Sequence, residues 1–269
     1  MVLFYDVFRK ELTNQEKFIC DYINTDKTIK ALCAEYHVSD RFLYKCIKDG
    51  TVPNRKDRHS DSYNRIISND ELKFYLFGLV AADGCMWKNK STIEISLQSD
   101  DRAILEMLSY SIYSTDRVLF RHTTHKPQCR LFLYGDDVYN MFCNVGIAPQ
   151  KSKDLHINFS KIPDNYFIDF FRGYFDGDGS YHYFNQNKIH VSIGCNEYMA
   201  YSFQKKIKDI FDIDSHVYYT PSAKVSFPWY RWTIAKKCNA VALINELYRD
   251  KQYFMERKRN IVKSFISAD

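Results

Sequence analysis

Two acidic residues, Asp83 and Asp178, each stand at the eighth place of a repeated nine-residue pattern. The copies are residues 76–84 (LFGLVAADG) and 171–179 (FRGYFDGDG), which share Gly at the third and ninth places. An apolar run enters each copy, as expected for a helix with a buried face. A duplicated helix that ends in a carboxylate can bring two carboxylates together at a pseudo-twofold axis. Such a pair is suited to binding a divalent metal ion.

The helical reading explains the glycines as well as the acids. Gly78 and Gly173 leave room for two helix backbones to approach closely, and Gly84 and Gly179 can take the backbone shape that ends a helix. Each acid would then lie at a helix C-terminus, where the helix dipole disfavours it by about 0.3–1 kcal/mol. Two such acids would also repel each other. A bound Mg²⁺ (or Mn²⁺) removes both costs, and the alternative is that the acids are simple helix caps.

These two segments resemble the motifs of the LAGLIDADG homing endonucleases in their single-chain, two-motif form, over roughly residues 70–269. The resemblance implies that the carbonyl groups of Ala82 and Gly177 add metal ligands. It also implies one basic residue near each scissile phosphate, at Lys151 and Lys258, with solvent-exposed phosphate contacts as the alternative. Asp176 has Ala81 as its counterpart in the first copy, so we interpret it as structural or supporting.

The bulk composition is that of a globular chain, with 269 residues, 45% hydrophobic and 26% charged. The formal charge of +5 permits nucleic-acid binding without establishing it. The eight cysteines are scattered and form no Cys-x-x-Cys pair, which favours reduced thiols in an intracellular protein. No apolar stretch approaches the ~18 residues of a membrane span. We therefore expect a cytoplasmic, nucleoid-associated protein, or a nuclear or organellar one in a eukaryote.

The N-terminal part, residues 1–52, is expected to be a small helical domain. Apolar stripes on either side of a turn near residue 38 resemble a helix-turn-helix, and Gly50 would close its second helix. Ser39 or Asp40 can cap that second helix. The alternative is a three-helix cap that binds nothing. Residues 53–69 are polar and charged and are expected to form a linker. The expected DNA contacts of the first segment are Ser39, Arg41, Tyr44 and Lys45.

The remaining chain is expected to form two units, residues 70–160 and 161–269. Strict alternation at residues 92–98 and 188–193 predicts half-buried strands, and helical and strand-like stretches follow each in the same order. The fold class is therefore α+β: two pseudo-symmetric αββαββα units packed through their motif helices, plus the helical N-terminal domain. The order of elements repeats more clearly than the letters.

A four-stranded sheet in each unit could lie in the major groove of DNA. Apolar residues of the alternating strands would face the motif helices, and polar residues would face the bases. An ordinary solvated sheet face is the alternative. The expected DNA-facing residues are Thr92, Glu94, Ser96, Gln98, Arg121, Gln128 and Arg130 in the first unit, and Lys188, His190, Ser192, Lys224 and Arg231 in the second.

The sequence therefore predicts a monomeric, Mg²⁺-dependent endonuclease that cuts both strands of a long double-stranded DNA target. By the resemblance, the cuts lie across the minor groove and leave 3′ overhangs, and the gene would be mobile. No small-molecule cofactor and no membrane partner are expected. The alternatives are a non-catalytic DNA-binding regulator or an intron RNA maturase on the same fold.

Overall fold

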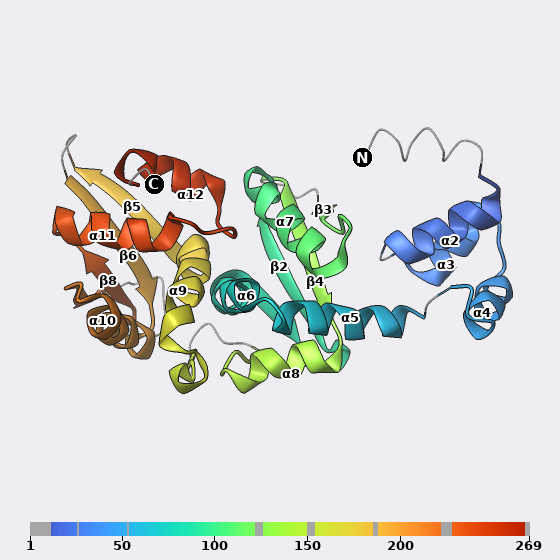
Figure 1. The fold of residues 1–269 in the computed structure, drawn as a ribbon, viewed down its shortest axis with the longest axis horizontal. Helices are drawn as coiled ribbons and strands as arrows, with labels where there is room; N and C mark the ends of the chain where they lie inside the picture. The colour runs from blue at the N-terminus through green and yellow to red at the C-terminus, as the bar shows by residue number, and fades with distance from the viewer. Residues whose placement is uncertain are drawn as a thin grey trace.

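The protein is described by a computed structural model that covers residues 12–25, 27–52, 54–121, 126–149, 154–184, 188–221 and 228–266 (Figure 1). In this described part of the chain, three short helices are followed by a longer helix and then by two α+β units. Among these described segments, no helix has the length and apolar character that crossing a bilayer requires.

The N-terminal helices are α2 (Asn14–Asn24), α3 (Ile29–Tyr36) and α4 (Asp40–Lys48). They enclose a separate small core in which Phe18, Leu32 and Leu43 are fully buried. Between α3 and α4 the chain turns through His37 in the left-handed conformation, with φ of 55°, and Ser39 caps α4 by accepting from the backbone N–H of Arg41 at 3.2 Å. Two helices joined by a short turn thus lie where the sequence predicted a helix-turn-helix.

The expected linker contains a helix, α5 (Arg55–Ile67). Its second half carries Ser62 and Ile66 on one face, and both side chains are buried. The helix packs against two helices of the first unit, α7 (Arg102–Tyr113) and α8 (Asp136–Asn144). Its polar composition had hidden this narrow buried stripe.

The two units have the same order of elements, αββαββα. In the first unit, short 3₁₀ turns at Lys88–Lys90 and Ser99–Asp101 lie between these elements. In the second unit, helix α12 (Glu256–Val262) and a 3₁₀ turn at Lys263–Phe265 follow them. The first comprises α6 (Asp70–Asp83), β1 (Gly84–Trp87), β2 (Thr92–Gln98), α7, β3 (Leu119–Arg121), β4 (Gln128–Tyr134) and α8. The second, after a 3₁₀ turn at Phe159–Lys161, comprises α9 (Asp164–Asp178), β5 (Gly179–Phe184), β6 (Lys188–Cys195), α10 (Glu197–Phe211), β7 (His216–Tyr219), β8 (Tyr230–Ile234), α11 (Lys237–Tyr248) and α12 (Glu256–Val262).

The sheets repeat as well. Their strand orders are β1-β2-β4-β3 and β5-β6-β8-β7, and every pairing is antiparallel. Alternate residues such as Ile93, Ile95, Ile193 and Trp232 face the helices and are fully buried. The expected α+β class with two four-stranded units is confirmed.

Helices α6 and α9 lie side by side at the centre of the two units (Figure 1). A Cβ added to Gly78 would lie 1.9 Å from the carbonyl oxygen of Phe170, and one added to Gly173 would lie 2.0 Å from that of Tyr75. The two backbones are therefore in direct contact at these glycines, as the sequence predicted. Around them the second unit packs aromatic rings edge to face, for example Phe171 against Phe203 with centroids 5.0 Å apart.

Candidate metal and nucleic-acid site

Each motif helix passes directly into a strand. Asp83 is the last residue of α6 and Asp178 the last of α9, and Gly84 and Gly179 begin β1 and β5. Both glycines are extended, with φ of −80° and −77°, so a left-handed helix end is not what they provide. They are required because a Cβ would lie 2.6 Å from the Val80 side chain at one site and 2.3 Å from the Phe175 ring at the other.

The two helix ends are adjacent. A Cβ added to Gly177 would lie 2.4 Å from the Cβ of Ala82 and 3.0 Å from Oδ2 of Asp83. Asp83 and Asp178 also share neighbours, because both carboxylates act to raise the pKa of the Tyr174 hydroxyl and that of the Lys258 ammonium. Both acids are exposed to solvent. The structure thus places the two motif acids at one location.

Lys258 lies buried beneath this location. Its Nζ donates to the carbonyl oxygens of Phe175 at 2.6 Å, Gly179 at 2.7 Å and Gly177 at 3.3 Å. These carbonyls belong to the C-terminal turn of α9, where a cation opposes the negative end of the helix dipole. Burial lowers the pKa of Lys258 to about 8, although Asp176 and the two motif acids act in the opposite direction. The ammonium is therefore held by backbone, with the exposed acids above it.

Asp176 is the second buried charge below the acids. Its Oδ2 accepts from the backbone N–H of Met255 at 2.8 Å and from the hydroxyl of Tyr75 at 2.9 Å. Its Oδ1 has no hydrogen-bond partner among the described residues. Burial raises the pKa of Asp176 to about 6, against the opposing effect of Lys258. The side chain links α9 to the segment before α12, which agrees with a structural or supporting role.

A network of buried charges, nearer the N-terminal end of α9, also holds the segment that precedes α12. The guanidinium of Arg172 is fully buried and pairs with Asp169 at 2.9 Å and Glu71 at 2.8 Å. Its Nε donates to the carbonyl of Tyr253 at 2.6 Å, and Lys251 pairs with Asp169 at 2.9 Å. At the equivalent positions of α6, Phe74 stands in place of Asp169 and Phe77 in place of Arg172. The two motif helices therefore differ here, because only α9 carries buried charges at these positions. The network thus holds Tyr253 and its neighbours, the segment that leads into α12 and Lys258.

The donor set at the helix ends is two exposed carboxylates with backbone carbonyls next to them. Hard oxygen donors of this kind fit Mg²⁺, which retains waters and takes few protein ligands. Within the described parts of the chain, no group of three or more His, Cys, Asp or Glu residues could hold a metal. The carbonyl oxygen of Gly177 also accepts a hydrogen bond from Lys258 Nζ at 3.3 Å, which leaves its second lone pair for a metal ion.

A small cavity of about 180 Å³ opens beside Asp178. Sequence reasoning missed its outer wall, which includes Asn196 and Trp229. No motif marks these residues, since only the folded β6 and β8 region brings them to α9. The full lining is Ala81, Ala82, Leu155, Tyr174, Asp178, Cys195, Asn196 and Trp229.

The open face of the first sheet carries most of the predicted DNA-facing residues. Arg130 and Glu94 form an ion pair there at 3.1 Å. The side chains of Ser96 and Gln128 are half-buried, while Gln98 and Arg121 are exposed. Thr92 differs from the prediction, because it is buried and its hydroxyl donates to the carbonyl of Lys90 at 2.8 Å.

The open face of the second sheet is built from different residues. Arg231 is exposed, and His190 is half-buried opposite His182. Ser192 also differs from the prediction, because it is buried and its hydroxyl lies 3.0 Å from that of Ser180. The predicted residues Lys151 and Lys224 lie outside the described residues, as does the side chain of Lys188, whose backbone begins β6.

On the N-terminal domain, α4 presents Arg41, Tyr44 and Lys45 to solvent. Ser39 is also exposed, but its hydroxyl is committed to capping that helix. Three of the four predicted contacts are therefore available on one helix.

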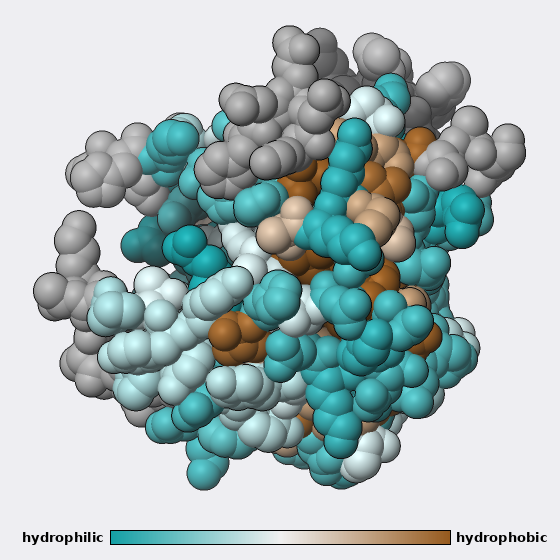
Figure 2. Space-filling model, turned by 90° about the vertical axis from the view of Figure 1, so that its left-hand side faces the viewer, coloured by the Kyte–Doolittle hydropathy of each residue, from teal (hydrophilic) through white to brown (hydrophobic). Residues whose placement is uncertain are grey.

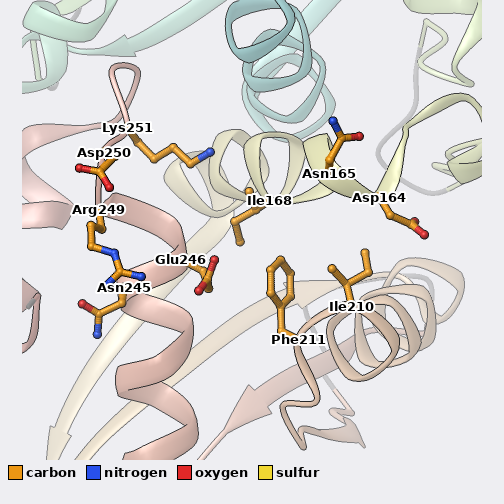
Figure 3. Close-up of a pocket in the computed structure, with 10 residues that line it drawn as sticks. All are labelled: Asp164, Asn165, Ile168, Ile210, Phe211, Asn245, Glu246, Arg249, Asp250 and Lys251. Carbon is orange, nitrogen blue, oxygen red and sulfur yellow. The ribbon is translucent and has the colours of Figure 1, made fainter.

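A larger cavity, of about 360 Å³, lies at the other end of α9 (Figure 3). The helix has 15 residues from Asp164 to Asp178, and its 14 residue-to-residue steps put the cavity about 21 Å from the motif acids along the helix. Ile168, Ile210 and Phe211 contribute apolar wall, and charged residues such as Lys251 surround them. Lys251 is paired with Asp169, and this pocket has no part in the site above.

The end of the molecule formed by the second unit is mostly hydrophilic, with apolar residues gathered in a broken strip (Figure 2).

The arrangement defines a two-unit α+β protein in which two motif helices bring paired acids together between two open sheets. Solved structures that match it include LAGLIDADG homing endonucleases, the family that the motifs resemble. I-DmoI in complex with DNA and Ca is 11% identical, with a TM-score of 0.47, over 70% of this chain and 95% of that one. I-GzeII in complex with its DNA target is 14% identical, with a TM-score of 0.47, over 71% and 87%.

A third match is full-length DUF199/WhiA from Thermatoga maritima, which is 16% identical, with a TM-score of 0.46, over 80% of this chain and 67% of that one. No protein-family model matches the chain, and no curated protein matches it. At these identities the matches are a likeness of fold and assign no reaction to this chain.

Proposed function

We propose that the protein is a site-specific endonuclease that hydrolyses phosphodiester bonds on both strands of double-stranded DNA, with Mg²⁺ or Mn²⁺, leaving 3′ overhangs. The observation that carries the proposal is that the two motif helix ends are adjacent. Gly177 packs against Ala82, and a Cβ added to Gly177 would lie 3.0 Å from Oδ2 of Asp83. Paired acids at one axis suit two scissile phosphates, one on each strand.

In this proposal Asp83 and Asp178 hold the metal, with the carbonyls of Ala82 and Gly177 as further donors. Bound there, Mg²⁺ supplies charge that activates water and stabilises the attacked phosphate and the leaving oxygen. The carboxylates position that charge at the mouth of the site. Lys258 neutralises the α9 helix end from below, and Lys151 is proposed to act near the other phosphate.

The open sheet faces are proposed to lie in the major groove on either side of the cut. The major groove is wide enough to admit strands, and the side chains of Arg121, Arg130 and Arg231 can contact guanine edges or phosphates. Residues 1–52 are proposed as a DNA-binding domain that flanks the cut, with units at 70–160 and 161–269. Because one chain supplies both halves, we propose a monomer, in the cytoplasm or in a nucleus or organelle.

The test is cleavage of DNA that spans the insertion site of the gene, with Mg²⁺, by the wild type and by Asp83→Asn and Asp178→Asn. We expect metal-dependent double-strand cuts by the wild type and loss of at least one strand cut in each variant, with DNA binding retained. A folded wild type that binds this DNA and never cuts it would refute the endonuclease.

The second candidate is a sequence-specific DNA-binding regulator, which the well-formed helix-turn-helix of α3 and α4 favours. Binding without cleavage would support it. Binding to the cognate intron RNA with rescue of splicing would instead support a maturase.

A further inference from the structure

The open face of the first sheet contains an aromatic patch, which consists of Trp87, Phe132 and Tyr134. Trp87 and Tyr134 both oppose Thr92 across the sheet, and Phe132 opposes Glu94 in the adjacent row. Directly opposed residues share a face, so all three rings lie on the side away from the helices. Trp87 is 46% exposed, and the rings of Phe132 and Tyr134 are nearly parallel with centroids 6.0 Å apart.

The second sheet has no aromatic ring of Phe, Tyr or Trp at the equivalent places, although its open face carries Tyr218, 55% exposed, opposite Arg231. His182 follows Gly179 by three residues, as Trp87 follows Gly84, and Thr233 opposes Ser192 where Phe132 opposes Glu94. The architecture therefore does not need aromatic residues at these places. Trp87 is exposed, and Phe132 and Tyr134 are half-buried, so this face of the first sheet offers aromatic surface at places where the second sheet has none. Such surface suits a contact with an apolar group.

The aromatic patch continues directly into the predicted base-reading surface. Arg130 lies over the Phe132 ring at 5.4 Å and pairs with Glu94, which puts ionic and aromatic groups in contact. A duplex seated on Arg130, Gln98 and Gln128 must also pass over the rings. The major groove offers one apolar group at its base edges, the 5-methyl of thymine.

We infer that the aromatic patch reads thymine methyl groups in the half of the target that lies over the first sheet. The inference rests on the proposed function and adds the chemistry by which one half-site is chosen. Trp87 lies four residues beyond Asp83 on a strand that rises about 3.3 Å per residue. The recognised thymines therefore lie within about four base pairs of the cut, at about 3.4 Å per base pair.

The test begins with a target selected from random duplexes by the full chain in metal-free buffer. Thymines are then replaced by uracil in one half at a time, which removes the methyl group and keeps base pairing. We expect uracil to weaken binding about fourfold per contacted methyl in the half over the first sheet, within about four base pairs of the cut, and to have no effect at the equivalent positions of the other half. Trp87→Ala is expected to bind thymine and uracil duplexes of that half nearly equally.

His182→Ala is the matched control, because it removes a ring at the equivalent place of the second sheet and should leave the thymine-to-uracil ratio unchanged. Equal binding of thymine and uracil in both halves, or a selected target without thymine within four base pairs of the cut, would overturn the inference. So would tighter binding to single-stranded oligonucleotides that depends on Trp87, which would mean base stacking. If the protein binds and cuts the duplex and uracil has no effect, only this inference is refuted. If the protein binds no duplex at all, the proposed function is refuted as well.

Discussion

The Nζ of Lys258 donates a 2.7 Å hydrogen bond to the carbonyl oxygen of Gly179, the first residue after the second motif acid. The lysine thereby fastens α12 to the end of α9 at the point where helix becomes strand. Two further carbonyls of the same turn share this ammonium. Its position makes Lys258 a part of the framework beneath the acids as well as a charge near them.

Lys258→Met should destabilise the protein, because it leaves three carbonyls of a buried helix end without this donor. We expect a loss of about 2–4 kcal/mol in the free energy of unfolding, measured by urea titration. Lys263→Met, at an exposed lysine close by, is the control and should change stability by less than about 0.5 kcal/mol. Equal effects of the two substitutions would contradict a framework role for Lys258.

Asp176 should give stability a pH dependence between about pH 4 and 6 in metal-free protein. Its folded pKa of about 6 lies above the ordinary 3.8, so the folded state binds more protons in that window. Its contribution to stability is therefore complete below the unfolded pKa and is lost as the pH rises through 6. Asp176→Asn cannot ionise and should gain on the wild type across this range, by at most about 3 kcal/mol. Parallel unfolding profiles of the two proteins from pH 4 to 7 would argue against it.

Gly173→Ala should disrupt the pairing of the motif helices, because the new Cβ would lie 2.0 Å from the carbonyl oxygen of Tyr75. We expect destabilisation of about 3 kcal/mol or more, seen as a lower Tm. Gly50→Ala is the comparison, since no atom lies within 4 Å of its added Cβ and only its φ of +77° is strained. A Gly173→Ala protein as stable as Gly50→Ala would mean that the helices can separate without cost.

Arg172→Met should cost about 3–5 kcal/mol, because it leaves Asp169 and Glu71 without their shared buried partner. The segment before α12 should also loosen, since Arg172 holds the carbonyl of Tyr253. Hydrogen exchange of the backbone N–H of Met255 would report this. Arg249→Met, on an exposed arginine at the end of α11, should leave that exchange unchanged.

Arg231→Ala should weaken DNA binding more than Arg130→Ala. Arg130 is paired with Glu94 at 3.1 Å, whereas no ion pair of Arg231 occurs among the described residues. The Arg231 variant should lower the slope of binding against salt by about 1, as expected for one lost phosphate contact. A larger slope change for Arg130→Ala would show that the Glu94 pair opens on binding.

Much of the architecture follows from local patterns. The duplicated Gly and Asp places predicted the central helices, and the strict alternation of residues 92–98 and 188–193 predicted one strand of each sheet. The short strands β1 and β5 were not located, because a strand that begins directly after a helix has no turn residue to mark it. α5 was mistaken for a linker because, among its described side chains (residues 61–67), only Ser62 and Ile66 are buried.

The exposed acids of the site were predicted from the sequence, but the buried contacts beneath them were not. Paired acids can be read from a repeat, but the burial of Lys258 and the lone Oδ1 of Asp176 depend on a segment almost eighty residues further along the chain. Trp87 was overlooked because polar residues are the usual readers of bases, and because its place on the open face depends on the register of β1.

Because α6 and α9 enter β1 and β5 with no loop between, nothing can absorb a displacement of either sheet before it reaches the adjacent carboxylate. A duplex that seats poorly on one sheet would shift the acid of that same half. In the proposed endonuclease, fidelity of cutting would then exceed fidelity of binding, since a misfit would misplace the two carboxylates even where the complex survives.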